Sequence, residues 1–215
     1  MSHPTITALR SLVDSRFPAA ARKPGGGVAT GVAAVDDALG GGLPAGRLTE
    51  LVSPVAGSGG QLVFTQLLVT TRRERQRVAL VDAADGFAPE TLPDDALRHL
   101  VWVRPGKLSE TLAATDLLVR DGNYAVVVLD LRGMARRELL RIPKTQWHRL
   151  HRAAESRPAA VLVQTTEALV PAVPWRLELA TPPGWAARRR PREQLLAQLT
   201  VHCTRGHAQI EELAG

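Results

Sequence analysis

The chain of 215 residues has one cysteine, Cys203, three lysines, one asparagine and only 4% aromatic residues. One cysteine excludes a disulfide framework and a four-cysteine zinc site. No run of 18 apolar residues occurs, so the sequence predicts no membrane span. The N-terminal stretch lacks the apolar core of a signal peptide, which indicates a cytoplasmic protein. Hydrophobic residues at 45% and charged residues at 22% are typical of a globular domain rather than a disordered chain.

The positive charge is concentrated in the second half of the chain. Lysine and arginine total 27 against 21 acidic residues, which gives a net charge of +6. Residues 1–100 are balanced at ten of each sign, so residues 101–215 carry the whole excess. Abundant arginine and alanine beside scarce lysine, asparagine and isoleucine indicate the base composition of a GC-rich genome. The isoelectric point near 10.6 therefore overstates the case for a nucleic-acid partner.

The order of apolar runs predicts an α/β fold with a mostly parallel, twisted sheet and helices on both faces. Expected strands cover 47–52, 78–82, 100–103, 124–130 and 160–164, and expected helices cover 31–39, 61–73, 109–120 and 144–156. The alternating segment 175–180 indicates an edge or antiparallel strand, and 199–203 and 209–213 are expected to close the sheet with antiparallel strands near the C-terminus. We divide the chain into an N-terminal helix and Pro/Gly-rich linker (1–28), a core (29–180), and a Pro/Arg-rich loop with C-terminal strands (181–215).

A glycine-rich turn follows the first expected strand, where a phosphate-binding loop has the pattern G-x-x-x-x-G-K-[ST]. Backbone N–H groups and a helix N-terminus attract phosphate in such a loop. Here Gly59 stands at the lysine position and Gly60 at the hydroxyl position. Two interpretations stay open: a turn that only joins strand to helix, and a turn with residual anion or nucleotide binding. The residues of this degenerate loop site are Gly57, Ser58, Gly59 and Gly60, together with Asp130 at a strand end.

The segments around this loop resemble the RecA family of recombinases over roughly residues 29–180. The resemblance is carried by GGGLPAGRLTELV at 40–52, VALVDAADGFAP at 78–89 and GNYAVVVLD at 122–130. It implies a RecA-like core in which Asp130 matches the Walker B aspartate. Position 84, where the family has a glutamate that polarises the attacking water, holds alanine, and the sensor region reads Gln164-Thr165. Loss of the lysine and the activating carboxylate removes most of the machinery of phosphoryl transfer, so we expect no catalytic residue and neither ATP nor Mg²⁺ as a cofactor.

Degenerate RecA-like chains of this size resemble the ImuA and SulA-like group of bacterial SOS proteins. The segments VPWRLEL at 173–179 and CTRGH at 203–207 favour the ImuA branch. That resemblance implies an accessory role in DNA-damage-induced translesion mutagenesis. The implied partners are an ImuB-like inactive relative of the Y-family polymerases, an error-prone replicative-type polymerase subunit and RecA itself. Two alternatives stay open: an ATPase that takes its cation from Arg72, Arg73 or a neighbouring protomer, and a SulA-like division inhibitor that binds FtsZ.

A basic segment follows the Walker B strand, where DNA-lining loops lie in RecA proteins. Residues 131–160 hold eight basic and two acidic residues, a net charge of +6. This density favours sequence-independent contacts to DNA phosphates and association with the nucleoid. A protein-docking face and a solvated helix face are the alternatives. The second basic run, at 188–192, could likewise contact a phosphate backbone or an acidic partner, or have no binding role. The predicted DNA-binding residues are Arg132, Arg136, Arg137, Arg141, Lys144, Arg149, Arg152, Arg188, Arg189, Arg190 and Arg192.

Three further features carry weaker expectations. Leu9, Leu12, Val13 and Phe17 share one face of the N-terminal helix, which is read as an attachment element for the chain itself, a twin or a partner. Neither the histidines at 148 and 151 nor Asp82, Asp85 and Asp130 have the spacing of a metal site, so no metal is expected. Cys203 lies in an apolar run and is expected in the core.

Overall fold

A seven-stranded sheet forms the centre of the molecule. The computed structural model describes residues 26–180 and 190–206. The face of Leu9, Leu12, Val13 and Phe17, the residues Arg188 and Arg189, and the expected strand 209–213 lie outside this part. The strands are β1 (Leu48–Val52), β2 (Val78–Asp82), β3 (Leu100–Val103), β4 (Val126–Asp130), β5 (Ala160–Thr165), β6 (Trp175–Leu179) and β7 (Val201–Arg205).

The strand order is β3-β2-β4-β5-β1-β6-β7. Six strands run parallel, and β7 pairs antiparallel with β6. The predicted mostly parallel sheet with an antiparallel element near the C-terminus is confirmed. Of the two expectations for 175–180, the antiparallel pairing is confirmed by β7, and the edge position is wrong because β6 also pairs with β1. Its alternating pattern has another cause, since Trp175, Leu177 and Leu179 pack against the core while Glu178 is exposed.

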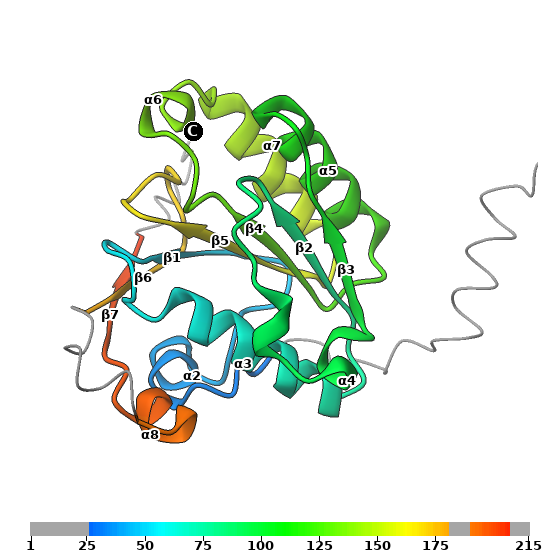
Figure 1. The fold of residues 1–215 in the computed structure, drawn as a ribbon. Helices are drawn as coiled ribbons and strands as arrows, with labels where there is room; N and C mark the ends of the chain where they lie inside the picture. Colours follow the sequence, from blue (N-terminus) through cyan, green and yellow to red (C-terminus); the bar gives the residue numbers. More distant parts are fainter. Residues whose placement is uncertain (1–25, 181–189, 207–215) are drawn as a thin grey trace, which may run out of the picture.

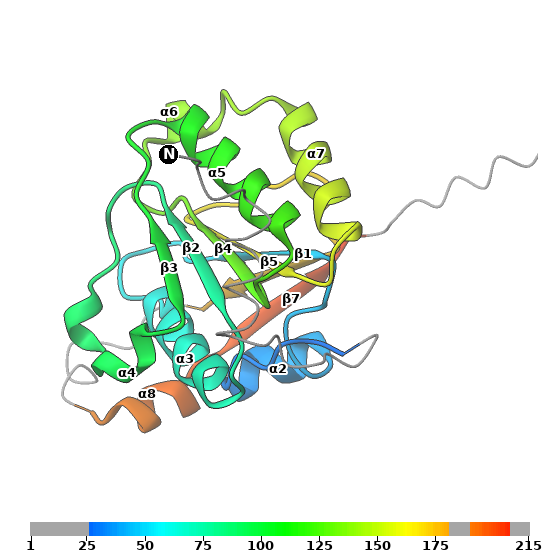
Figure 2. The same cartoon turned by 90° about the vertical axis from the view of Figure 1, so that its right-hand side faces the viewer.

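Helices cover both faces of the sheet (Figures 1 and 2). α2, α3, α4 and α8 lie on one face, and α5, α6 and α7 lie on the other. The short helices α4, α6 and α8 were not among the expected elements, because one to two turns are too few to show a helical period. The bounds are α2 (Ala33–Leu39), α3 (Gly60–Arg73), α4 (Asp94–Leu97), α5 (Leu108–Asp121), α6 (Arg136–Leu139), α7 (Lys144–Glu155) and α8 (Arg192–Ala197), with a 3-10 turn at Pro89–Thr91.

The central strands are buried on both faces, which explains their uninterrupted apolar sequences. In β4, Val126 and Val128 pack toward α2 and α3, while Val127 and Leu129 pack toward α5 and α7. The sheet thereby divides the core into two apolar layers. It also aligns the carboxyl ends of β1, β2 and β4 along one edge, which is where ligands bind in parallel α/β sheets.

Cys203 is exposed on β7, so its expected place in the core is wrong. The strand is the last of the sheet, and four of its five residues, from His202 to Arg205, are exposed. An edge strand has no neighbour on its outer side to shield its side chains, which an apolar run in the sequence does not reveal. Within the described residues, no helix has the length and apolar character needed to cross a bilayer.

Candidate functional site

A cavity of about 840 Å³ lies at the carboxyl ends of β1, β2 and β4. The glycine-rich turn between β1 and α3 forms one wall, and the strand-end carboxylates Asp82 and Asp130 form another. The two aspartates sit opposite each other in the register of β2 and β4. Leu195 and Leu199 of the α8 region complete the lining. The degenerate loop and Asp130, singled out from the sequence, are therefore brought together in one cavity.

The glycine-rich turn is held by its own serine. Ser58 Oγ donates to the carbonyl oxygen of Val55 at 2.7 Å and accepts from the Val55 N–H at 3.2 Å. The side chain is buried, with 2% of the residue exposed. Ser58 thus closes the turn on itself rather than offering its hydroxyl to the cavity.

The backbone conformation and Leu199, which follows α8, leave no room for a lysine at position 59. Gly59 has a φ of 107°, a conformation that side-chain-bearing residues rarely adopt. A Cβ at this position would lie 2.5 Å from Leu199 Cδ2. A lysine would therefore need both a different turn and a displaced Leu199.

Position 60 is closed to a side chain in a similar way. A Cβ on Gly60 would collide with Ser53 Oγ and lie 2.6 Å from Arg132 Nη1. A serine or threonine hydroxyl cannot be placed there without moving both groups. The space beside Gly60 Cα is thus bordered by a hydroxyl and a guanidinium.

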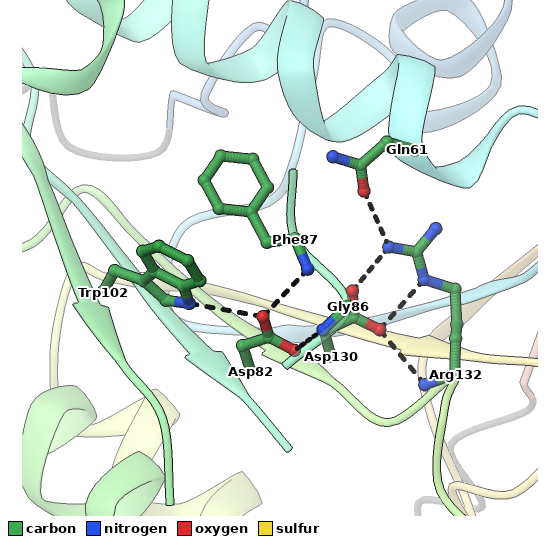
Figure 3. A network of polar contacts seen from close by, with 7 residues as sticks. All are labelled: Gln61, Asp82, Gly86, Phe87, Trp102, Asp130 and Arg132. Atoms are coloured by element: carbon green, nitrogen blue, oxygen red, sulfur yellow. Dashed lines mark hydrogen bonds and ion pairs between the residues drawn. The ribbon is translucent and has the colours of Figure 1, made fainter. Parts of the chain in front are cut away.

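The guanidinium of Arg132 forms an ion pair with the carboxylate of Asp130 (Figure 3). Its Nε and Nη2 donate to the two Asp130 oxygens at 2.9 and 2.5 Å, and its backbone N–H donates to Oδ1 at 3.1 Å. Nη2 also donates to Gln61 Oε1 at 3.2 Å. Only 19% of the Arg132 side chain and 8% of the Asp130 side chain are exposed. This bidentate, charge-assisted pair is shielded from water and fixes both side chains.

Asp82 stabilises the turn that follows β2 through the hydrogen bonds that its carboxylate accepts. It accepts from the N–H groups of Gly86 and Phe87, each at 3.0 Å, and from Trp102 Nε1 at 3.3 Å (Figure 3). The turn presents Ala84 beside Gly133, where a Cβ would collide with the Ala84 methyl. Position 84 therefore offers packing and no carboxylate to the cavity.

The acidic residues do not gather into a metal centre. Asp85 is exposed and pairs with Arg104 at 3.5 Å, away from the engaged oxygens of Asp82 and Asp130. In the part of the chain that the structure describes, no three histidine, cysteine or acidic side chains form a group suited to a metal ion. Gln164 of the sensor region is completely buried, and neither of its amide atoms has a hydrogen-bond partner among the described residues.

Comparison with known proteins finds relatives named RecA and RadB, in agreement with the RecA-like motifs. The chain is 36% identical over 107 residues to the Protein RecA of Chlorobium chlorochromatii, which covers 48% of this chain and 30% of that protein. It is 30% identical over 115 residues to the DNA repair and recombination protein RadB of Thermococcus kodakarensis, of which the match covers 50%. The fold is RecA-like.

The similarity is confined to part of each protein. This chain spans half or less of the length of the relatives quoted, and Protein RecA of Streptomyces venezuelae, at 34% identity, is matched over 28% of its length. No family model matches the chain. These relatives support a RecA-like family, and the α/β architecture of the sheet agrees with them.

Outside the cavity, the RecA-like core carries exposed cations on α6, on α7 and between them. Arg136 bonds Glu167 at 2.6 Å, a contact that raises the pKa of the Arg136 guanidinium, and Arg149 lies 3.4 Å from Asp116. No ion pair within the described chain involves the other four. Trp147 is 2% exposed and has no free face for base stacking. The exposed cations are Arg136, Arg137, Arg141, Lys144, Arg149 and Arg152.

The remaining predicted DNA contacts divide into different environments. Arg132 lies in the cavity and apart from this surface. Arg192 donates to Thr65 Oγ1 at 2.8 Å and fastens α8 to α3, and its burial lowers the pKa of its guanidinium. Arg190 is exposed and donates to Gln198 Oε1 at 2.6 Å. Charge counting found all of these residues, but it could not separate those that face solvent from those that face protein.

Arg72 and Arg73, considered as alternative cations for the loop, lie at the far end of α3. The helix rises about 1.5 Å per residue, which places them about 18 Å along its axis from Gly60. Arg72 is also paired with Asp95 at 2.7 Å. Arg132 is thus the cation that the described residues bring to the cavity. Its spacing of two residues from the strand-end Asp130 was the available sequence signal.

Proposed function

We propose that this RecA-like protein is a non-catalytic accessory factor of DNA-damage-induced translesion mutagenesis. It binds DNA without sequence preference and joins it to protein partners. The observation that carries the non-catalytic part is the Arg132–Asp130 pair beside two side-chain-free positions, Gly59 and Gly60. The Asp130 carboxylate is paired with an arginine. Among the described lining residues, Gly59, Gly60 and Ala84 stand where the family has the lysine, the hydroxyl and the activating carboxylate of phosphoryl transfer.

The exposed cations of α6 and α7 support DNA binding. Four of them, Arg137, Arg141, Lys144 and Arg152, have no ion-pair partner in the described part of the chain and are available for phosphates. The names of the relatives, a recombination and repair protein among them, agree with a DNA partner. Since the nearby Trp147 is buried, we expect contacts to the backbone and not to the bases.

The partner class rests on the ImuA-like segments of the sequence. We propose an ImuB-like inactive Y-family polymerase relative, an error-prone replicative-type polymerase subunit and RecA as the proteins bound. Pull-down of each purified candidate by this protein tests the assignment. Binding of FtsZ in place of these proteins would assign the chain to the division inhibitors instead.

Fluorescence anisotropy with labelled single- and double-stranded DNA at two salt concentrations tests the DNA role. The variant Arg137→Ala/Arg141→Ala/Lys144→Ala removes three unpaired charges. It should bind more weakly. The magnitude of the slope of log K against log salt should fall by about 0.9 on duplex DNA, and by about 0.7 on single-stranded DNA, for each phosphate that the variant no longer neutralises.

The matched control is Arg73→Ala/Arg75→Ala/Arg98→Ala. It removes the same charge from exposed positions around α3 and α4, on the opposite face of the sheet (Figure 1). It should keep wild-type affinity apart from the weak effect of net charge. Equal decreases in affinity in both variants, or no binding by the wild type at low salt, would refute a DNA-binding face on α6 and α7.

A further inference from the structure

The cavity does not fit the Mg²⁺ ion that a RecA-like fold implies. Both oxygens of Asp130 are held by Arg132, and the hydroxyl that would share the ion is absent at Gly60. Nη1 of Arg132 reaches to the side of Gly60, within 2.6 Å of where a Cβ would be. The guanidinium therefore borders the cavity between the strand-end carboxylate and the start of α3.

A second observation shows that this space is still polar. Ser53 is 5% exposed, and its Oγ has no hydrogen-bond partner within the described residues. The same oxygen lies against the Gly60 Cα, where a Cβ would collide with it. Burying a hydroxyl without a partner costs free energy, so an unpaired hydroxyl at a cavity wall points to a ligand that completes it.

Three kinds of donor meet at this point. They are the Ser53 hydroxyl, the Arg132 guanidinium and the N–H groups of the first turn of α3, which have no partners within the helix. Together they match the oxygens of a phosphate group, which accepts several hydrogen bonds and is favoured at a helix N-terminus.

The rest of the cavity suits an uncharged body attached to that phosphate. Val55, Leu195 and Leu199 line it with apolar surface. Its volume of about 840 Å³ lies within the ordinary range for small-molecule sites. The described lining thus has one polar corner and one apolar wall.

We propose that the cavity binds a nucleotide-type phosphate ester without a divalent metal, with Arg132 in the place of the ion. The proposal goes beyond the accessory function, which does not require a nucleotide. The Asp130 and Arg132 charges cancel, so the site attracts the phosphate through hydrogen bonds more than through net charge. Added Mg²⁺ finds no free carboxylate in the pair and does not strengthen binding.

Calorimetric titration with ADP and with inorganic pyrophosphate, in EDTA and in Mg²⁺, tests the proposal. The dissociation constant for ADP should agree within about twofold between the two conditions, since a tenfold change would need about 1.4 kcal/mol from the metal. Pyrophosphate, which lacks the apolar body, should bind more weakly than ADP. Binding that appears only with Mg²⁺, or no binding of ADP by the wild type, would overturn the proposal.

Two variants test the site, and circular dichroism checks that each of them is folded. Arg132→Ala should lower ADP affinity at least about tenfold in EDTA, consistent with the removal of a charged hydrogen bond. Ser53→Ala leaves the ion pair intact and should lower it several-fold. Arg136→Ala is the control, because Arg136 lies on the outer surface. Unchanged ADP binding in Ser53→Ala and Arg132→Ala with native circular dichroism would refute the site.

A DNA backbone carries the same phosphate chemistry, and competition separates the two sources. Saturating unlabelled single-stranded DNA should leave ADP binding unchanged. Displacement of ADP would assign the cavity to the DNA path and overturn the nucleotide proposal. DNA binding by Ser53→Ala should match the wild type, so failure of the nucleotide site and failure of the DNA role give different results.

Discussion

At the scale of single residues, small side chains define the cavity as much as charged ones. Gly59 and Gly60 carry no side chain because Leu199, Ser53 and Arg132 fill the adjoining space. A side chain at either position would therefore meet neighbouring residues that are already packed there. Restoring a lysine at 59 or a threonine at 60 alone would not restore a catalytic geometry.

Gly60→Ala should destabilise the protein by about 1–3 kcal/mol, as over-packing of a filled site does. The added methyl meets Ser53 Oγ, and alanine's better helix propensity does not offset this. Urea unfolding measures the effect. Introducing Gly60→Ala into Ser53→Ala should cost less, because the colliding oxygen is gone.

Gly86→Ala serves as the comparison for Gly60→Ala. A Cβ there meets nothing within 4 Å, and its N–H still donates to Asp82. Its free energy of unfolding should stay within about 0.5 kcal/mol of the wild type. A similar decrease at both glycines would mean that the space around Gly60 is not closed.

At the scale of elements, buried polar groups connect segments that lie far apart in the chain. Glu50 of β1 is fully buried and accepts from the N–H groups of Leu169 and Val170 at 2.7 and 3.0 Å. Arg176 of β6 donates to it at 2.6 Å. The Glu50 carboxylate therefore holds the connection between β5 and β6 against β1.

Glu50→Ala should cost about 3–5 kcal/mol, because it leaves Arg176 and two N–H groups without their acceptor. Glu50→Gln keeps one acceptor oxygen and should cost less. Chemical denaturation of both variants gives the comparison. Equal stability of the wild type and Glu50→Ala would contradict a role for this carboxylate in holding the connection.

His99 links α3 to the start of β3, with its Nε2 2.9 Å from Thr71 Oγ1. Burial, aided by the charge of Arg72, lowers the pKa of His99 from 6.5 to about 4. Between these values the unfolded chain holds a proton that the folded protein does not. Stability should therefore fall as the pH drops from 6.5 toward 4.

Urea titrations at pH 7 and pH 5 measure this dependence. His99→Gln, which has no titrating ring, should lose less stability between the two pH values than the wild type does. An identical pH dependence in both proteins would place its origin in other groups.

At the scale of the whole molecule, the two faces of the sheet carry different surfaces. One face, with α3 and α8, closes the cavity, and the other, with α6 and α7, presents the exposed cations. The described chain thus separates the cavity from a broad basic surface. Their properties are measurable independently of each other.

The purified protein should release no phosphate from Mg²⁺-ATP above the uncatalysed rate, with or without DNA. Among the described lining residues, Gly59, Gly60 and Ala84 stand where the family has the lysine, the hydroxyl and the activating carboxylate, and phosphoryl transfer depends on such positioning and charge-stabilising groups. A coupled phosphate-release assay checks this. Turnover that disappears in Asp130→Asn would reverse the non-catalytic assignment.

The sequence predicted the main strands and the parallel sheet because buried strands produce continuous apolar runs. It also placed the glycine-rich turn and Asp130 at the same sheet edge. It did not predict the contact of Leu199 with Gly59 or the pairing of Arg132 with Asp130. These depend on contacts between segments far apart in the chain, such as Leu199 with Gly59, and charge counting assigned Arg132 to the outer surface. Cys203 was misplaced because hydrophobicity does not distinguish an edge strand from an inner one.

The exposed position of Cys203 has a practical consequence. It is the only thiol in the sequence, and it stands on β7, the strand that follows α8. A maleimide dye or a nitroxide label would therefore attach at one defined place without any engineered cysteine. Changes in its emission or spectral line shape would report ligand binding beneath α8 in the native sequence.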